Sequence, residues 1–147
     1  MSITRQNIIS NMVARFASIT TPVYYTQIGA HLFEHKTVPF TDTELPGINI
    51  ADTDETLELD AEDASITIHT LNVRIDAAFA GATSATEARK AIADIDKAIN
   101  VDKTWGGYAR RTLPVSNTLI GDQEDLYITG VSVNIQIEYL TSAFEES

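Results

Sequence analysis

The sequence predicts an α+β fold in which a mixed or antiparallel β-sheet carries two amphipathic helices packed on one face. Two segments, one near the start of the chain and one at residues 84–100, repeat their apolar residues every three or four positions. That period is typical of a helix with one buried stripe. Two further segments, 65–79 and 127–139, alternate apolar and polar residues for much of their length, as half-buried strands do. Helices and strands that each bury one side are expected to pack as layers.

The first helix is expected to begin at a cap formed by Ser2 or Thr4 and to end at residues 17–20, before Pro22. Residues 23–28 have the composition of a short strand, and residues 31–46 that of a long irregular loop with two prolines. An extended segment resumes at residues 45–50. The apolar stripe of the first helix consists of Ile8, Ile9, Met12, Val13 and Phe16.

The second half of the chain has more regular patterns. In the strand at 65–79 the alternation changes phase between Ile68 and Leu71, which predicts a bulge. After Gly81, Thr83 or Ser84 caps a second helix that ends at 100–102. A strand at 113–119, a polar turn at 121–125 and the strand at 127–139 follow. The apolar stripe of the second helix consists of Ala88, Ala91, Ile92, Ile95, Ala98 and Ile99. One face of the last strand carries Val131, Val133, Ile135, Ile137 and Tyr139, opposite Ser132, Asn134, Gln136 and Glu138.

The composition is that of one globular domain spanning residues 1–147. With 147 residues, 44% of them hydrophobic and 21% charged, the chain is long enough to bury a core. It contains no cysteine, which excludes disulfides and thiolate metal sites. No secretion signal and no run approaching about 20 apolar residues is present, so we expect a soluble, cytosolic protein that does not enter a membrane.

Charge is unevenly distributed along the chain. The formal net charge of −11 argues against a protein that grips nucleic-acid phosphates over a wide surface. Lys103, Arg110 and Arg111 form a small basic cluster late in the chain. Two interpretations stay open: a solvated acidic face, or head-to-tail association of identical subunits through opposite charges. The acidic part, which contains no Lys or Arg, comprises Asp42, Glu44, Asp52, Asp54, Glu55, Glu58, Asp60, Glu62 and Asp63.

Motifs for catalysis and metal binding are weak or missing. The glycine-rich nucleotide loops, the serine hydrolase elbow and the zinc protease helix do not occur, so we expect no enzyme, no cofactor and no metal. His31 and His35 have a metal-ligand spacing, but Gly29 argues against a helix there and no third ligand is evident. They are interpreted as surface histidines. His69, on the strand at 65–79, is expected to have a hydrogen-bonded structural role.

The acidic residues raise two further alternatives. Residues 52–63 place oxygens at alternate positions, as a calcium loop does, but Leu57 stands where that loop needs glycine. Weak divalent binding and a solvated strand edge both remain open for this segment. No pair of carboxylates stands out for glycoside chemistry.

The stretch DKTWGGYARRT, residues 102–112, contains the only tryptophan, the only Gly-Gly pair and the only adjacent arginines. One interpretation is a corner between helix and strand, in which Gly106 and Gly107 adopt positive φ and Trp105 folds over the helix end. The other is a contact surface, because an exposed aromatic beside Arg110 and Arg111 is typical of protein interfaces. Stacking on nucleic acid is disfavoured by the overall charge.

Taken in order, the segments resemble the tail terminator (tail completion) and minor tail proteins of long-tailed bacteriophages. The resemblance rests on the helix RQNIISNMVARF, the strand start LPGINI, the strand LNVRIDAAFA, the helix EARKAIADIDKAI running into TWGGYARRT, and the last strand VSVNIQIEYLT. It covers nearly the full length and consists of apolar patterns and turns rather than catalytic signatures. The stretch at residues 33–46 departs from the family pattern.

The resemblance implies a structural virion protein that forms a hexameric ring on the tail tube, ends tube polymerisation and offers the head-attachment surface. Its partners would be further copies of itself, the tail tube protein and a neck or head-completion protein. It would assemble in the host cytoplasm and lie at the tail–neck junction, with DNA passing through the lumen without specific binding. A negative lumen, suggested by the charge of −11 and the polar side of the last strand, would let DNA slide.

On this interpretation, two parts of the chain are expected at a subunit or tube interface: the stretch around Trp105 and the loop at residues 35–44. A head–tail connector or stopper-type neck protein is the alternative, since it would also be a small domain that forms a ring. A small-molecule-binding or enzymatic α+β domain would instead show a concave pocket with convergent polar groups. The expected interface residues are Trp105, Arg110, Arg111, His35, Lys36, Asp42 and Glu44.

Overall fold

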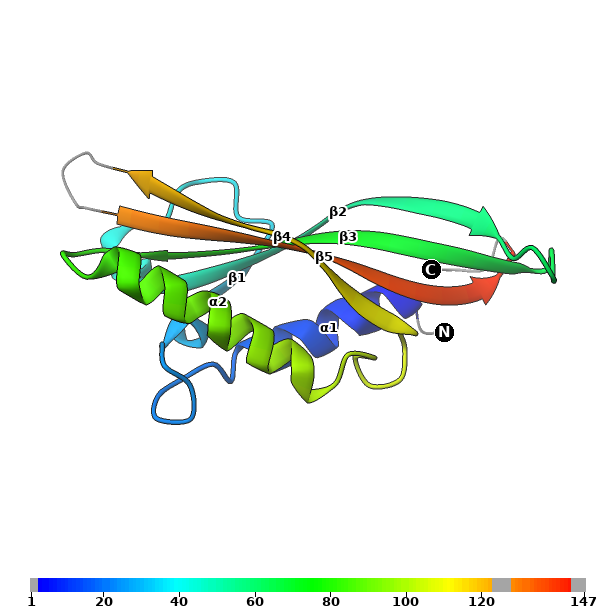
Figure 1. The fold of residues 1–147 in the computed structure, drawn as a ribbon, viewed down its shortest axis with the longest axis horizontal. Coiled ribbons are helices and arrows are strands. Elements are labelled where there is room, and N and C mark those ends of the chain that lie inside the picture. The colour runs from blue at the N-terminus through cyan, green and yellow to red at the C-terminus, as the bar shows by residue number, and fades with distance from the viewer. Residues whose placement is uncertain (1–2, 123–127, 144–147) are drawn as a thin grey trace.

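A computed structural model describes residues 3–122 and 128–143 of the chain. It has one five-stranded sheet with two long helices on the same side (Figure 1). The predicted α+β class is confirmed. The elements are α1 (Thr4–Phe16), β1 (Leu32–Glu34), β2 (Gly47–Leu59), β3 (Ile66–Phe79), α2 (Ser84–Val101), β4 (Arg111–Asp122) and β5 (Ile128–Ser142), with 3-10 turns at Ile28–Ala30 and Asp42–Glu44.

The strand order across the sheet is β1-β2-β3-β5-β4. β1 pairs with β2 in parallel, and the other three pairings are antiparallel, so the sheet is mixed. β1 is short and pairs only with residues 48–50 of β2. Within the described residues, the rest of β2 therefore has no strand on its outer side, and neither has β4 at the opposite edge.

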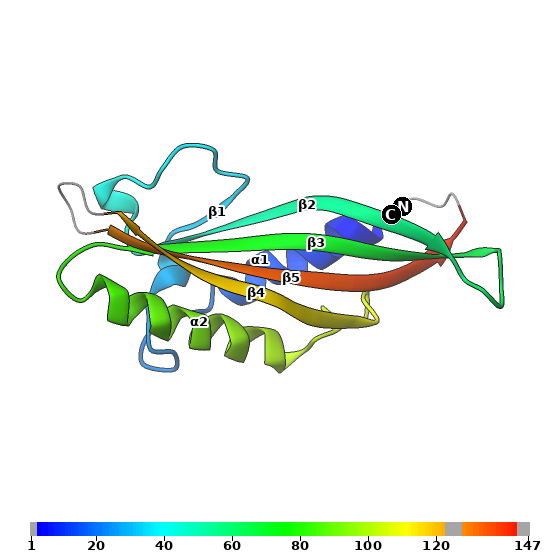
Figure 2. The same ribbon diagram turned by 45° about the horizontal axis from the view of Figure 1, so that its top comes forward.

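The core lies between the sheet and the two helices. Because residues directly opposite in neighbouring strands point to the same side, the register places the apolar rows of β3 and β5 together on the helix-facing side. α2 buries Ala88, Ala91, Ile95, Ala98 and Ile99 against them, as its predicted stripe requires. The loop that follows β1 lies on the opposite side of the sheet (Figure 2).

At α1 the N-cap residue is Ile3 rather than the predicted Ser2 or Thr4. At α2 the N-cap residue is Thr83, one of the two predicted, but it makes no side-chain capping hydrogen bond. Thr4 is the first helical residue of α1, and Ser2 lies outside the described residues.

The prediction of a strand at residues 23–28 is wrong. The segment forms turns instead, because the backbone N–H groups of Tyr25 and Thr26 donate to the Asp94 carboxylate on α2 rather than to a neighbouring strand. The loop predicted at 31–46 contains β1 and the 3-10 turn Asp42–Glu44.

The prediction of a bulge in β3 is also wrong. β3 pairs with β5 without a register shift, and its buried row runs unbroken through Thr67, His69 and Leu71. Ile66 and Ile68, which suggested the change of phase, lie on the side opposite the helices. The register shifts instead occur in β2, between Asp52 and Glu55, and in β4, between Pro114 and Ser116.

The strand predicted at 113–119 is confirmed and is longer than expected, as β4 shows. The predicted polar turn at 121–125 lies mostly outside the described residues, since 123–127 are not described. The alternating row of the last strand is confirmed in β5.

Candidate functional site

The stretch at residues 102–112 forms a tight turn between α2 and β4. Trp105, Gly106 and Gly107 have φ of 53°, 79° and 87°, which is the left-handed region that favours glycine. A Cβ added to Gly106 would lie 3.0 Å from Nδ2 of Asn11 on α1, so the turn is also packed closely. These features match the structural interpretation of the two glycines.

Trp105 is fully buried. Its ring lies edge-on to Phe16, with centroids 6.0 Å apart, and the Arg15 guanidinium lies 4.3 Å from its centroid. The indole N–H donates to Thr112 Oγ1 at 2.8 Å. The expectation of an exposed aromatic is therefore wrong, because the turn directs the indole against α1 and Thr112 of β4. The side chain of Trp105 has no surface left for a partner.

Arg110 and Arg111 remain exposed at the start of β4. Both guanidinium groups reach the carboxylate of Glu138 on β5, at 3.3 Å from Arg110 and 2.9 Å from Arg111. Arg111 lies directly opposite Glu138 in the register, on the side away from the helices. Two cations share one carboxylate, so this end of β4 keeps a net positive charge.

The loop at residues 35–44 is folded onto itself. The Lys36 ammonium lies 4.8 Å from the Phe33 ring centroid and 3.3 Å from Glu44 Oε2. Glu44 also accepts a hydrogen bond from the Thr41 backbone at 2.8 Å, which is the largest cause of its lowered pKa. Asp42 lies exposed in the 3-10 turn. Lys36 and Glu44 thus hold the loop together, while Asp42 offers its carboxylate to solvent.

The two histidines of the predicted loop bond to protein oxygens. His31 Nδ1 lies 3.2 Å from the carbonyl oxygen of Pro46, and His35 Nε2 lies 2.6 Å from Asp52 Oδ1. Burial favours a raised pKa for Asp52, but hydrogen bonds from His35 and Arg5 outweigh it and lower the pKa overall. Across residues 3–122 and 128–143, no group of three or more His, Asp or Glu side chains is arranged to hold a metal ion.

A buried polar cluster surrounds Glu55, at the bulge of β2. The Glu55 carboxylate accepts hydrogen bonds from Arg5 at 3.0 Å and from the Tyr139 hydroxyl at 2.6 Å, and it contacts Nδ1 of His69. His69 stacks on Tyr139 and bonds Thr141 through Nε2 at 2.7 Å. The structural role predicted for His69 is confirmed. The segment that resembles a calcium loop is instead strand at this point, and Arg5 occupies two of its carboxylates, those of Asp52 and Glu55.

Sequence reasoning missed Asp94, which is buried in the middle of α2. Its carboxylate accepts from the N–H groups of Tyr25 and Thr26 at 3.0 and 2.7 Å and from the Thr26 hydroxyl at 2.5 Å. The sequence feature that could have revealed it is an acidic residue within the apolar stripe of the helix, between Ala91 and Ile95.

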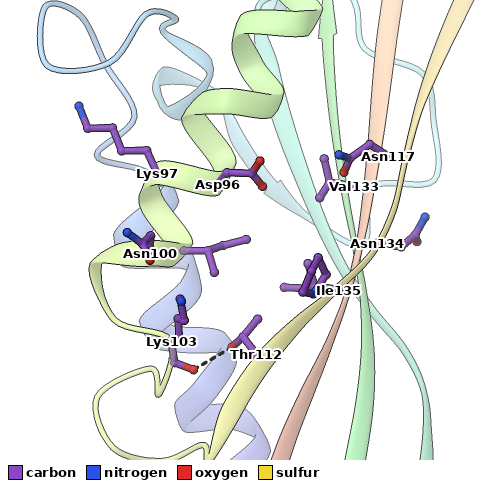
Figure 3. Close-up of a pocket in the computed structure, with 11 residues that line it drawn as sticks. Asp96, Lys97, Asn100, Lys103, Thr112, Asn117, Val133, Asn134 and Ile135 are labelled. Atoms are coloured by element: carbon purple, nitrogen blue, oxygen red, sulfur yellow. Dashed lines mark hydrogen bonds between the residues drawn. The ribbon is translucent and has the colours of Figure 1, made fainter.

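A groove of about 580 Å³ lies between the second half of α2 and β4 (Figure 3). Asp96 projects from α2 toward it, and burial raises the pKa of this carboxyl. Lys97 and Asn134 point away from it (Figure 3). The groove thus combines an apolar floor with a polar rim, rather than the convergent polar groups of a small-molecule site. Its floor consists of Ile99, Pro114, Val133 and Ile135.

Large apolar side chains are exposed at both edges of the sheet. On β4 they are Leu113, Val115, Leu119 and Ile120, and on the far half of β2 they are Leu57 and Leu59. Sequence reasoning missed both groups. The sequence feature that could have revealed them is the presence of large apolar residues among charged or polar ones in the segments 57–60 and 113–120.

The side of the sheet away from the helices carries little net charge and mixes polar side chains with apolar ones such as Ile68, Leu113 and Leu140. In β5 it shows Ser132, Asn134 and Gln136, with Glu138 bound to its two arginines. In β3, Arg74 pairs with Asp76 at 2.9 Å. The surplus of negative charge therefore does not lie on the polar side of the last strand; it lies along the far half of β2 and the turn after it.

Comparison with known proteins identifies no family. No protein-family model and no curated protein matches the chain. Among solved structures it is similar to a chain of a structure described as the virion of native gene transfer agent (GTA) particle, with 11% sequence identity and a TM-score of 0.41 over 95% of this chain and 92% of that one. A likeness at this level supports no conclusion about function. Within the described residues, no helix is long and apolar enough to cross a membrane.

Proposed function

We propose that this chain is a structural virion protein that caps the tail tube of a long-tailed phage as a hexameric ring. The ring ends tube polymerisation and forms the tail-side surface to which the head attaches. The observation that carries the proposal is the sheet itself: both helices pack on one face, which leaves much of the other face and parts of two unlike edges open. Unlike edges favour head-to-tail contacts, which close into a ring when the rotation between subunits allows it.

Charge supports head-to-tail association. The far half of β2 carries Asp54 and Glu58, whereas β4 begins at Arg111, directly after Arg110. A subunit with opposite charges on its two edges attracts the next copy and repels a copy turned the other way.

The face opposite the helices suits the lining of a channel. Among the described residues its cations are paired, Arg74 with Asp76 and Arg111 with Glu138, so it offers little free positive charge to bind phosphates. DNA would pass such a surface without specific binding. We therefore expect a nearly neutral lumen, rather than the negative lumen suggested by the net charge of −11.

The remaining contacts of the ring are assigned to exposed groups. Arg110 and Arg111 are proposed to meet a neighbouring subunit. The loop at residues 35–44, with His35, Lys36, Asp42 and Glu44, is proposed to face the tail tube or a neck protein. None of these roles requires covalent chemistry.

Solution mass and tube binding test the proposal. Light scattering over a wide concentration range, with negative-stain imaging of the largest species, is expected to show six-fold rings, and the protein is expected to bind the ends of purified tail tubes. A monomer at every concentration that also fails to bind tubes would overturn the proposal. Binding to filled heads in place of tubes would favour the stopper-type neck protein.

A further inference from the structure

We propose that the outer edge of β4 and the groove between α2 and β4 bind the far half of β2, residues 54–59, of a second copy of this chain. This pairing rests on the ring proposed above and names the two surfaces that meet in it. Both surfaces are open in the single chain, and they match in apolar character, strand direction and charge.

The far half of β2 has the properties of a strand that awaits a partner. β1 stops at residue 50 of β2, so no strand covers its outer side beyond that point in the described chain. Leu57 and Leu59 lie opposite His69 and Thr67, hence on the helix-facing side, yet they are 65% and 55% exposed. An unpaired edge with large exposed apolar side chains is normally covered in the assembled protein.

The β4 edge offers a complementary surface. On its helix-facing side, Thr112 and Pro114 border the groove. A strand added outside β4 would place its helix-facing side chains beside this groove, where Ile99 and Ile135 form part of an apolar floor. Leu57 and Leu59 of the second copy are the side chains that would lie there.

Strand direction fits the same arrangement. Three successive antiparallel pairings separate β2 from β4, so these two strands run in opposite directions within one subunit. A second copy that continues the sheet, with its helices on the same side, therefore adds its β2 antiparallel to β4. The end of β2 then lies near the beginning of β4.

Charge complementarity selects this pair of edges. Glu58 lies opposite Ile68 and Arg111 lies opposite Glu138, so both point to the side away from the helices and would be neighbours across the new pairing. Pairing β2 with another β2 would instead bring Asp54 and Glu58 against their own copies. Like charges at a contact disfavour that alternative.

A charge exchange in the full-length chain tests the contact. Glu58→Arg alone and Arg111→Glu alone each place like charges at it, and each is expected to raise the dissociation constant of self-association at least about tenfold, measured by concentration-dependent mass. The double variant Glu58→Arg with Arg111→Glu restores opposite charges and is expected to recover assembly. Arg89→Glu, which changes charge on the exposed side of α2, serves as the matched control and should assemble normally.

The apolar half of the contact has its own test. Leu57→Ser with Leu59→Ser is expected to weaken association at least about tenfold without changing the unfolding curve of the monomer, because both side chains are exposed there. Val23→Ser, at an equally exposed site in the loop after α1, should have no effect.

The outcomes separate this pairing from the ring itself. Rings that form normally in the two single charge variants, or a double variant no better than either, would overturn the pairing and leave the ring standing. Rings that survive the leucine changes would do the same. A wild-type chain that stays monomeric, both alone and on tail tubes, would overturn both.

Discussion

Asp102, directly after α2, organises the turn that buries the tryptophan. Its carboxylate accepts hydrogen bonds from the Thr104 hydroxyl at 2.5 Å and from the N–H groups of Gly106 and Thr104, both at 2.9 Å. These bonds, led by that from the Thr104 hydroxyl, lower the pKa of Asp102 from 3.8 to about 2. The charged carboxylate is thus the form that the folded turn prefers.

Stability should therefore depend on the charge of Asp102. A lowered pKa contributes stability above the ordinary value of 3.8 that is lost as the pH falls through about 2. We expect the urea midpoint of Asp102→Asn to lie below that of the wild type at pH 7, with a difference that narrows from about pH 4 downward. Equal midpoints at pH 7, or a difference that does not change with pH, would contradict this role.

Thr112 connects the buried indole to the backbone. Its hydroxyl accepts from Trp105 Nε1 and donates to the Lys103 carbonyl, each at 2.8 Å. Thr112→Val keeps the shape but leaves both partners unpaired, so we expect the free energy of unfolding to fall by about 1–3 kcal/mol. Trp105 fluorescence in urea measures this directly. Thr118→Val, at an exposed position of the same strand, should change it by no more than about 0.5 kcal/mol.

At the scale of elements, α2 fixes the loop that follows α1. Asp94 reaches from the buried side of the helix to the N–H groups of Tyr25 and Thr26, where a strand had been predicted. A strand needs a neighbouring strand for these donors, and a buried carboxylate provides the alternative. Two side chains of α2 therefore hold the loop, Asp94 and Lys97, whose ammonium donates to the Val23 carbonyl at 2.7 Å.

Removing that carboxylate should loosen the loop. Asp94→Ala leaves the N–H groups of Tyr25 and Thr26 without an acceptor, and we expect unfolding free energy to fall by about 1–3 kcal/mol. Hydrogen exchange at these two amides should speed up as well. Asp96→Ala, two residues later and facing the groove, removes a carboxyl whose pKa is raised by burial, so it should be neutral or slightly stabilising. A loss of stability in the second variant but not the first would contradict the assignment.

Sequence patterns predicted the elements whose packing is periodic. α2, β3 and β5 repeat their apolar residues regularly, and each was found where the pattern placed it. The patterns failed where a distant partner decides the structure. His69 is buried in β3 because Glu55 on β2 and Thr141 on β5 bond its ring nitrogens.

The candidate site was harder to predict for the same reason. Trp105 is buried because Phe16 and Arg15 of α1 meet it, and no local pattern contains that information. The exposed leucines of β2 also depend on distant structure, since β1 covers β2 only as far as residue 50 and the ion pairs of Arg5 on α1 reach only Asp52 and Glu55. The positive charge at Arg110 and Arg111 was visible in the sequence.

On the scale of the whole molecule, the proposed contact between the β2 edge of one copy and the β4 edge of another combines charge attraction with apolar contact. The screening length falls from about 8 Å at 0.15 M salt to about 3 Å at 1 M, and exposed charges are the ones affected. Glu58 and Arg111 are exposed, whereas the contact of Leu57 and Leu59 with the groove would be apolar. Salt should therefore weaken association without abolishing it.

The salt dependence of the variants makes this prediction specific to one contact. In wild type and in the double variant Glu58→Arg with Arg111→Glu, opposite charges meet, so the dissociation constant should rise with salt in both. In either single variant like charges meet, and screening should relieve their repulsion, so the dissociation constant should fall with salt. Sedimentation at several salt concentrations measures all four. If the single variants weaken with salt just as wild type does, these residues do not face each other, because only a direct contact reverses the sign.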